Sequence, residues 1–466
     1  MINTFGAWEA LGGDPALVDG VSAVVREGTL PSRLPVRERA RACVGACALA
    51  AAEWGARRAG LSAVPGVRVD DGAVAAAFLS ERQLRVDGRA PVNFAPLSRF
   101  WRGADGWVRT HANYPHHRQR LLDALGLAAD ASVETVAEAI AARPAVEVED
   151  LVYAAGGLAV AMRTPGEWAA HEQGRAVAAR PLVERERLDK APGRPLVPLD
   201  RSAGSPLLPA AGLRVLDLTR VISGPVATRT LALLGADVLR IDSPRLPELP
   251  DQHADLDAGK RSALLDLAAP ADRRTFEELL AEADVVVTGY RPGALDRWGL
   301  APEQLAGRRP GLVVAQVSAW GAYGPWGGRR GFDSLVQVAT GIALTEGSAG
   351  QPGALPAQAL DHGTGYLLAA AVLRSLTEQT EEGGTRLVRL ALARTAAWLT
   401  QGTGHGTGPD GPAAAYDGPE PWLAERDSGL GRLRYALPPV RFEDGPSDWA
   451  RPPGPWGEDT ARWDRP

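Results

Sequence analysis

The sequence predicts an α/β protein with a Rossmann-like, mostly parallel β-sheet and a smaller α+β domain. Residues 213–218 and 236–241 are short apolar runs rich in Val and Leu, as expected of strands that are buried on both faces. Pro225, an apolar stripe and Gly235 lie between them and indicate the start, the buried face and the end of a helix. A strand, a helix and a second strand in this order predict a parallel pair.

The alternation of strands and helices continues after this unit. We expect strands at residues 263–267, 284–287 and 312–317, and helices at residues 271–281, 293–298, 332–341 and 363–377, followed by a strand and a helix within 386–399. This pattern is typical of a parallel sheet with helices on both faces. The apolar run at residues 435–442 is expected to complete the sheet, because it would otherwise form an exposed edge.

The first half of the chain has its own helix and turn signals. Residues 37–59 show apolar positions at helical spacing, and Asp105-Gly106 lies between two β-prone runs, which indicates a hairpin. Ser132 and Thr164 are expected to cap helices, the second in a capping box with Glu167. We therefore predict a small α+β domain at residues 1–189, a Pro/Gly-rich linker at 190–211 and the Rossmann-like domain at 212–466.

Composition narrows the class of protein. The 466 residues carry a formal net charge of −5, which gives no basic surface for nucleic acid or for an anionic membrane. No signal peptide is recognised at Met1, and the Ala-rich run at residues 46–52 is too short to cross a bilayer, so we expect a cytoplasmic protein. Cys43 and Cys47 are expected to be buried, reduced thiols.

Five motifs carry a specific resemblance to a known family. They are LRVLDLTRVISGP from Leu213, then LLGADVLRID, AGKRSALLDL, ADVVVTGYRPGALDRWGL and ALDHGTG. In this order they resemble the family III CoA-transferases, the group of carnitine, bile-acid and formyl-CoA transferases. The resemblance is dense over residues 212–376. The segment before residue 210 resembles the smaller domain that ordinarily follows this region, so the domain order is rearranged.

Asp361 is the candidate catalytic residue. It stands just before a predicted helix whose first turn contains Gly363 and Gly365, and on these residues alone an N-cap is the better interpretation. The resemblance instead implies that Asp361 is the nucleophile of an acyl-CoA:carboxylate CoA-transferase. It implies a mixed anhydride and then an aspartyl-CoA thioester, with backbone N–H groups near Gly363 stabilising the oxyanion. The glycine-rich residues 402–411 are a candidate lid.

The resemblance also implies a CoA site. No cofactor is expected to be tightly bound: coenzyme A or acyl-CoA is a substrate, the other substrate is a carboxylic acid, and the protein is expected to be a homodimer. The helix start near residues 220–224 suits an anion. The residues at matching CoA-contact positions are Val221, Ile222, Ser223, Gly259, Lys260, Arg261, Tyr290, Arg291 and Arg297.

Two other functions stay open. An α-methylacyl-CoA racemase needs a second acid/base, and its superfamily carries a His where this chain has Phe332, which cannot titrate. His362 is a weaker substitute for that base. The other alternative is a non-catalytic CoA-binding protein or subunit. No metal site is expected, because the histidines show no metal-ligand spacing.

Overall fold

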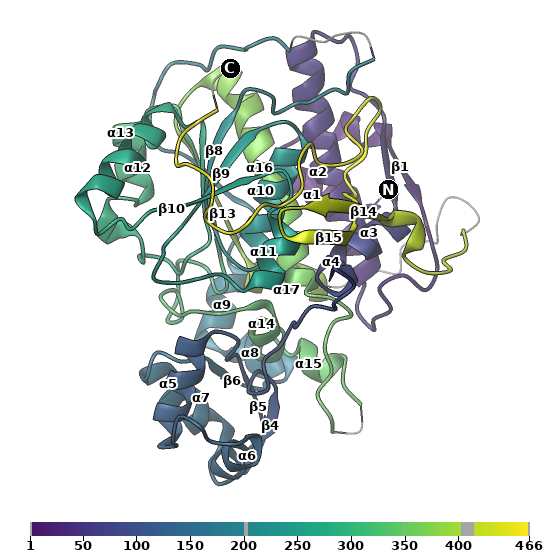
Figure 1. Ribbon diagram of the computed structural model, residues 1–466. Coiled ribbons are helices and arrows are strands. Elements are labelled where there is room, and N and C mark those ends of the chain that lie inside the picture. Colours follow the sequence, from purple (N-terminus) through teal and green to yellow (C-terminus); the bar gives the residue numbers. More distant parts are fainter. Residues whose placement is uncertain (1, 200–203, 349, 402–413, 465–466) are drawn as a thin grey trace.

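The computed structural model describes residues 2–199, 204–348, 350–401 and 414–464, and its centre is a seven-stranded sheet (Figure 1). The strand order is β10-β9-β8-β11-β12-β13-β7. All neighbours pair in parallel except β7, which pairs antiparallel with β13. The strands are β10 (Arg261–Leu264), β9 (Asp237–Asp242), β8 (Arg214–Leu218), β11 (Val285–Thr288), β12 (Val313–Ser318), β13 (Arg386–Ala391) and β7 (Glu184–Arg187). The predicted α/β fold is confirmed.

Helices cover both faces of this sheet, as the strand composition predicts. Val285 and Val287 of β11 belong to a core that includes α10 and α16, whereas Val286 between them faces α12 and α13. Alternate side chains of one strand thus enter two separate cores. The covering helices are α10 (Ser223–Leu233), α16 (Ala359–Glu382), α12 (Pro270–Glu282), α13 (Pro302–Arg308), α17 (Leu392–Thr400), α14 (Asp333–Ala339), α15 (Ile342–Thr345), α11 (Pro250–Leu256) and η2 (Asp296–Trp298).

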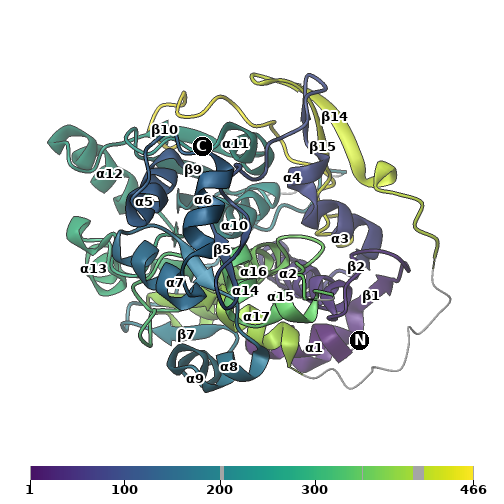
Figure 2. The ribbon, with the colours of Figure 1, turned by 90° about the horizontal axis from the view of Figure 1, so that it is seen from below.

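A smaller lobe lies below the sheet in Figure 1 and faces the viewer in Figure 2. It contains a three-stranded sheet of order β4-β5-β6, from β4 (Phe100–Arg102), β5 (Trp107–Thr110) and β6 (Ala159–Ala161). Its helices are α5 (Pro115–Leu125), α6 (Val133–Ala141) and α7 (Ala145–Ala154). The predicted hairpin at Asp105-Gly106 and the cap by Ser132 are confirmed. Helices α8 (Pro165–Ala170) and α9 (Glu172–Ala178) follow, and the capping box of Thr164 and Glu167 is present.

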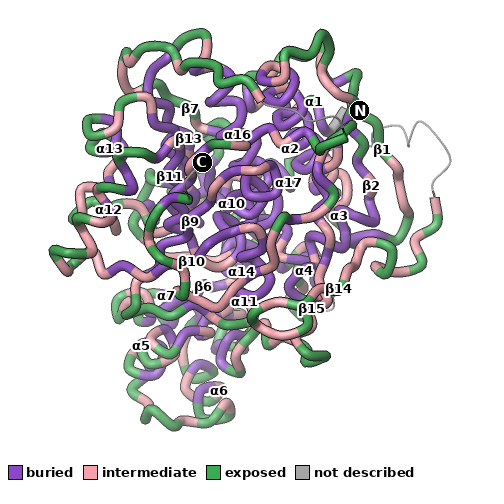
Figure 3. The backbone as a smooth tube through the Cα atoms, turned by 45° about the horizontal axis from the view of Figure 1, so that its top comes forward, coloured by how far each residue is buried: buried purple, intermediate pink, exposed green. Residues whose placement is uncertain are grey.

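The N-terminal residues pack on the sheet helices rather than on the small lobe. Helix α2 (Val36–Ala59) lies along α16, and the tube in Figure 3 shows both in the buried centre. The ion pair between Arg374 and Glu53 and the contact of Gly45 with Val69 extend this packing to β2. The remaining elements here are α1 (Ile2–Ala10), η1 (Pro15–Gly20), β1 (Val21–Val24), β2 (Val67–Asp70), α3 (Asp71–Phe78) and α4 (Ser80–Gln83).

These contacts bear on the predicted division into residues 1–189, 190–211 and 212–466, which stays a prediction about domains. The first segment contributes α2 to the sheet helices, a separate lobe over about residues 93–161, and β7 to the sheet itself. Part of the linker follows α2, where Arg58 donates hydrogen bonds to the carbonyls of Val197, Pro209 and Ala211.

The expectation that residues 435–442 complete the large sheet is wrong. Strand β15 (Gly431–Ala436) pairs with β14 (Leu423–Ser428) and β3 (Arg85–Val86) in a separate sheet, next to η3 (Glu420–Trp422). The edge is covered instead by β7, whose alternating Glu and Arg residues suit a half-exposed strand. Sequence order concealed this pairing, because β7 comes from the other half of the chain.

Two composition-based expectations have a structural counterpart. Cys43 and Cys47 are buried free thiols, as predicted, and burial raises the pKa of Cys43 to about 12. Among the residues that the structure describes, no helix combines the length and apolarity needed to cross a membrane. The cytoplasmic location stays a prediction.

Candidate active site

A cavity of about 770 Å³ lies between the sheet and the small lobe. Leu218, Asp242 and Ser318, which end β8, β9 and β12, line one side of it. Tyr114 and His117, at the start of α5, line the other. The carboxyl ends of parallel strands are where ligands bind in open α/β sheets, so this cavity is the candidate active site.

Asp361 forms part of the cavity wall and lies in the first turn of α16. Only 6% of its surface is exposed. Its backbone N–H donates a hydrogen bond of 2.9 Å to Oδ2 of Asp333, the first residue of α14, so two helix starts meet at this carboxyl group. Asp333 is also held by a hydrogen bond from the side-chain amide of Gln337. The arrangement fixes the position of Asp361 and places a second carboxylate beside it.

This environment disfavours the charged form of Asp361. Burial raises its pKa well above the ordinary value, and the nearby carboxylates of Asp333 and Glu81 raise it further. Burial also raises the pKa of Asp333 to about 6, although hydrogen bonds to that carboxylate oppose the shift. Perturbed, interacting carboxyl groups in a cavity wall are typical of a catalytic site.

The glycines of the ALDHGTG motif serve helix packing. A Cβ at Gly365 would lie 2.5 Å from the carbonyl oxygen of Ser223, so Gly365 permits the close approach of α10 and α16. A Cβ at Gly363 would lie 3.4 Å from Sγ of Cys43, which places Gly363 against α2. Gly363 is not among the cavity-lining residues, and the predicted oxyanion role finds no support in this position. The candidate lid, residues 402–411, lies outside the described residues.

The predicted CoA-contact residues divide into two groups. Val221, Ser223, Tyr290, Arg291 and Arg297 line the cavity. The other group consists of residues that do not line it: Ile222, Gly259, Lys260 and Arg261.

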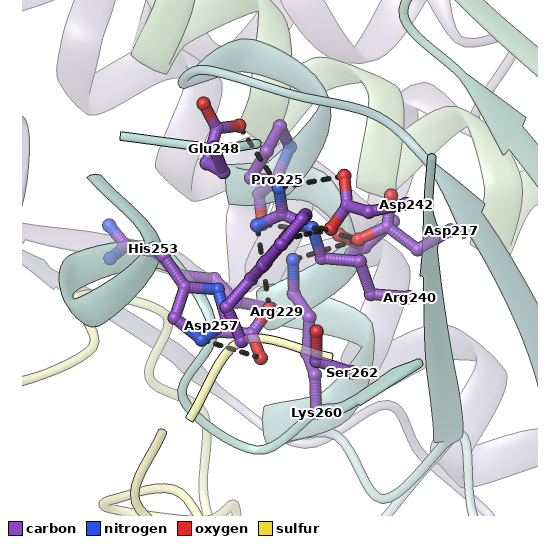
Figure 4. A network of polar contacts seen from close by, with 12 residues as sticks. Asp217, Pro225, Arg229, Arg240, Asp242, Glu248, His253, Asp257, Lys260 and Ser262 are labelled. Carbon is purple, nitrogen blue, oxygen red and sulfur yellow. Dashed lines mark hydrogen bonds and ion pairs between the residues drawn. The ribbon is translucent and has the colours of Figure 1, made fainter. Parts of the chain in front are cut away.

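Lys260 belongs to a buried network of charges (Figure 4). Its ammonium group lies 2.9 Å from Oδ2 of Asp217, and both side chains are fully buried. Burial opposes the ionisation of Asp217, but Lys260 and Arg240 lower its pKa below the ordinary value. Arg261 is paired with Asp237 at 2.7 Å. These two basic residues are therefore engaged by carboxylates of the strands rather than presented to the cavity.

Sequence reasoning missed the centre of this network. Arg240 contacts Asp242 at 2.7 Å, Glu248 at 3.0 Å and Asp257 at 3.6 Å, with 1% of each side chain exposed. The hydroxyl of Tyr114 donates to Glu248, which connects the network to the small lobe. An Arg in the middle of the buried strand VLRID was the signal available, because a buried charge requires partners.

A second group of basic residues in the cavity region is differently placed. Arg120 of α5, Arg291 and Arg330 lie near one another, and the pKa of Arg330 is lowered by burial and by its two neighbours. None of the three forms an ion pair with a carboxylate of the described chain. Arg297 also lines the cavity, is exposed and has no such pair. These four guanidinium groups are available to an anionic ligand.

The histidines gather where the sequence showed no order. His111 stacks on Phe332 with ring centroids 3.6 Å apart, and His117 meets the edge of Phe332 at 5.9 Å. Phe332 lines the cavity beside Asp361, as a residue without acid/base chemistry. His362 is fully buried, and its Nε2 lies 3.3 Å from Glu81, so it is not presented to the cavity as a second base. Within the described chain, no cluster of His, Cys, Asp and Glu could hold a metal ion.

Comparison with known proteins supports this assignment. Residues 210–421 match the family model described as CoA-transferase family III. The chain is 35% identical over 207 residues to the acetyl-coenzyme A transferase nodX of Hypoxylon pulicicidum, covering 43% of this chain and 35% of that protein. It is 32% identical to the probable fatty acyl-CoA transferase Rv3272 of Mycobacterium tuberculosis, covering 42% and 53%.

Further relatives extend the same picture. The formyl-CoA:oxalate CoA-transferase of Bradyrhizobium sp. (strain ORS 278) is 33% identical, with 39% of this chain and 45% of that protein covered. A crystal structure of Rv3272 covers 42% of this chain and 57% of its own, with 33% identity and a TM-score of 0.40. The chain thus spans about a third to a half of the length of these curated relatives. The resemblance read from the five motifs is confirmed, and residues 210–421 belong to CoA-transferase family III.

Proposed function

We propose that the protein is a CoA-transferase that moves coenzyme A from an acyl-CoA donor to a carboxylic acid acceptor. The observation that carries this proposal is the position of Asp361, a buried carboxyl group in the wall of a cavity of about 770 Å³. Family membership of residues 210–421 supports it. Asp361 is the proposed nucleophile, and its reaction passes through an aspartyl-CoA thioester.

In the first half-reaction, a carboxylate oxygen of Asp361 attacks the thioester carbonyl carbon. The C–O bond forms as the carbonyl electron pair moves to oxygen, and collapse of this oxyanion breaks the C–S bond. The products are a mixed anhydride and CoA thiolate. The thiolate then attacks the aspartyl carbonyl carbon, so that the donor acid leaves and aspartyl-CoA remains. The acceptor acid reverses these steps: its carboxylate attacks aspartyl-CoA, and the thiolate takes the acceptor acyl group from the new anhydride.

The surroundings of Asp361 suit this chemistry. Asp333 accepts the backbone N–H of Asp361 and so holds the start of α16 in place. Because burial and neighbouring carboxylates raise the pKa of Asp361, its ionised form is a more basic nucleophile than an exposed aspartate. Burial also limits the access of water, which would hydrolyse the anhydride.

We place the CoA moiety against the sheet side of the cavity. Val221 and Ser223 stand at the start of α10, where a helix terminus offers positive potential, and Val221 has a φ of +69° that turns the chain into this helix. Arg291 and Arg297 supply guanidinium groups for phosphates, and Tyr290 supplies a flat surface. Gly259, Lys260 and Arg261 act on this site from outside the cavity, through the strands that they fasten.

The proposal is tested by incubating the purified protein with a panel of acyl-CoAs and free acids and measuring new thioesters by mass spectrometry. We expect at least one donor and acceptor pair to exchange CoA. Absence of exchange across the panel, with CoA still bound, would favour the non-catalytic CoA-binding alternative.

The racemase alternative makes a different prediction. Two-base exchange at an α-carbon needs a titratable group on each face, and Phe332 stands where the racemase base would stand. We therefore expect no Asp361-dependent uptake of deuterium from heavy water into a 2-methylacyl-CoA. Rapid uptake would move the racemase activity to first place.

The homodimer that the family resemblance implies is a further part of the proposal, as is the absence of a tightly bound cofactor. Light scattering of the purified protein checks the first: a homodimer has twice the 49.1 kDa mass of the chain. Mass spectrometry of the denatured and the native protein checks the second.

A further inference from the structure

His117 is a buried imidazole for which the protein supplies no hydrogen-bond partner. It lies in the first turn of α5, has 5% of its surface exposed and lines the active-site cavity. No described residue forms a hydrogen bond with either ring nitrogen, and Nδ1 is buried without any partner. Buried polar groups are almost always satisfied, and leaving one unsatisfied is costly. A polar group of a ligand in the cavity would remove that cost.

The ring lies at the Asp361 end of the cavity. Its edge contacts Phe332 at a centroid distance of 5.9 Å, and Phe332 directly precedes Asp333, which binds the backbone of Asp361. Phe332, Asp361 and His117 line the same cavity. In an acyl-CoA the pantetheine arm separates the phosphates from the thioester, so a ligand group that meets His117 belongs to the acyl or acceptor part.

The charges around His117 favour an anion. Burial lowers the pKa of His117 to about 2, and His116, His111, Arg330 and Arg120 lower it further, so the ring is neutral at physiological pH. Arg120 lies one turn further along α5, and it lines the cavity with Arg330. Neither guanidinium group is paired with a carboxylate of the described residues. A neutral N–H donor beside two unpaired guanidinium groups is suited to a carboxylate.

We propose that His117, together with Arg120, binds a second carboxylate of the transferred or accepting acid, so that the enzyme acts on dicarboxylic acids and their mono-CoA thioesters. This inference rests on the proposed CoA transfer and specifies its substrate class. His117 acts as a specificity-determining residue: it donates a hydrogen bond to the distal carboxylate while Asp361 reacts at the other end. No proton is transferred to or from the imidazole in this role.

The test compares acids of matched length: succinate, glutarate and adipate against butyrate, pentanoate and hexanoate. Each is tested as an acceptor and, by calorimetry in the presence of CoA, as a ligand. We expect the wild type to prefer the best diacid over its monoacid by about tenfold or more in both measurements. The variants His117→Phe and Arg120→Gln should lose most of this preference while still using the monoacid.

Three controls keep the outcomes distinct. Arg118→Gln alters the same helix outside the cavity and should leave the preference unchanged. His117→Gln keeps a side-chain donor and should retain part of the preference, which a merely structural role would not explain. The affinity for CoA alone should be the same in the wild type, His117→Phe and Arg120→Gln, because the bound anion is not a phosphate.

Several results would overturn the inference. One is a wild type that binds monoacids as well as diacids, and another is a preference that survives in both variants. A selective loss of CoA affinity in the variants would assign the site to a phosphate instead. If diacids bind with the expected His117 dependence but no thioester forms, the specificity site stands and the proposed transfer fails.

Discussion

Two groups of basic side chains lie on neighbouring parts of this fold, and they differ in how their charges are balanced. Arg240 and Lys260 are fully buried and surrounded by carboxylates at 2.7–3.6 Å. Arg120, Arg330 and Arg297 line the cavity and have no carboxylate partner within the described chain. The first group resembles a closed structural network, whereas the second resembles a site that waits for an anion.

The comparison shows why a motif match is not enough to place a ligand contact. Lys260 is one of two lysines in the chain and falls in a family motif, which made it a strong CoA-contact candidate. In the fold its ammonium group is enclosed with Asp217. Whether a charged residue is paired inside the protein depends on strand register, and register is not visible in the spacing of one motif.

The largest expected effect concerns Asp361. Replacing it by Ala removes the proposed nucleophile, and we expect the rate of CoA transfer to fall by at least about a thousandfold. Folding and CoA binding should be nearly unchanged, because the phosphate-binding arginines remain. Steady-state kinetics with calorimetric CoA titration measures both. Full turnover by Asp361→Ala would contradict the assignment.

The next effect separates the two basic groups by stability. Lys260→Met leaves Asp217 buried without its partner, and we expect the free energy of unfolding to fall by about 3–5 kcal/mol. Arg245→Gln is the matched control, because its ion pair with Asp266 is largely exposed and contributes about 1 kcal/mol or less. Urea unfolding gives both values. Equal losses would show that the buried network is not a structural unit.

Arg297 tests the other side of the comparison. Arg297→Gln should raise KM for acyl-CoA about tenfold with little change in kcat, because it removes a phosphate contact far from the reacting carbonyl. Arg308→Gln serves as a control, since Arg308 is paired with Glu277 outside the cavity. If both variants behave alike, Arg297 is a solvated surface residue.

The smallest effect is a shift in pH dependence caused by Asp333. Its carboxylate raises the pKa of Asp361, and the reactive form of Asp361 is the ionised one. Asp333→Asn removes that negative charge, lowers the pKa of Asp361 and should move the acidic limb of the kcat/KM profile to lower pH. A profile that moves to higher pH, or does not move, would show that the two carboxyl groups are not coupled.

The sequence predicted the fold well where local patterns determine it. Buried Val-rich strands, helix caps such as Ser132 and the turn at Asp105-Gly106 depend on nearby residues, and these predictions are confirmed. The edge strand β7 was missed because its pairing with β13 joins residues about 200 positions apart. Its charged sequence also lacks the apolar run by which buried strands are recognised.

The candidate site was predictable only in part. The flanking motif identified Asp361 from the resemblance, and the cavity around it agrees with that choice. His111 and His117 were set aside because their spacing suggested no metal site, yet the fold brings them to Phe332, more than 200 residues away. Contacts between two lobes depend on tertiary packing, which sequence spacing does not encode.

The central claim is that Asp361 becomes covalently attached to CoA during transfer. The most direct measurement is to add an acyl-CoA donor without an acceptor, reduce the enzyme with borohydride or trap it with hydroxylamine, and locate the modification by peptide mass spectrometry. We predict a modification at Asp361 that depends on the donor and is absent from Asp361→Asn. Modification at another carboxyl group, or complete transfer by Asp361→Asn without any trapped species, would contradict the account.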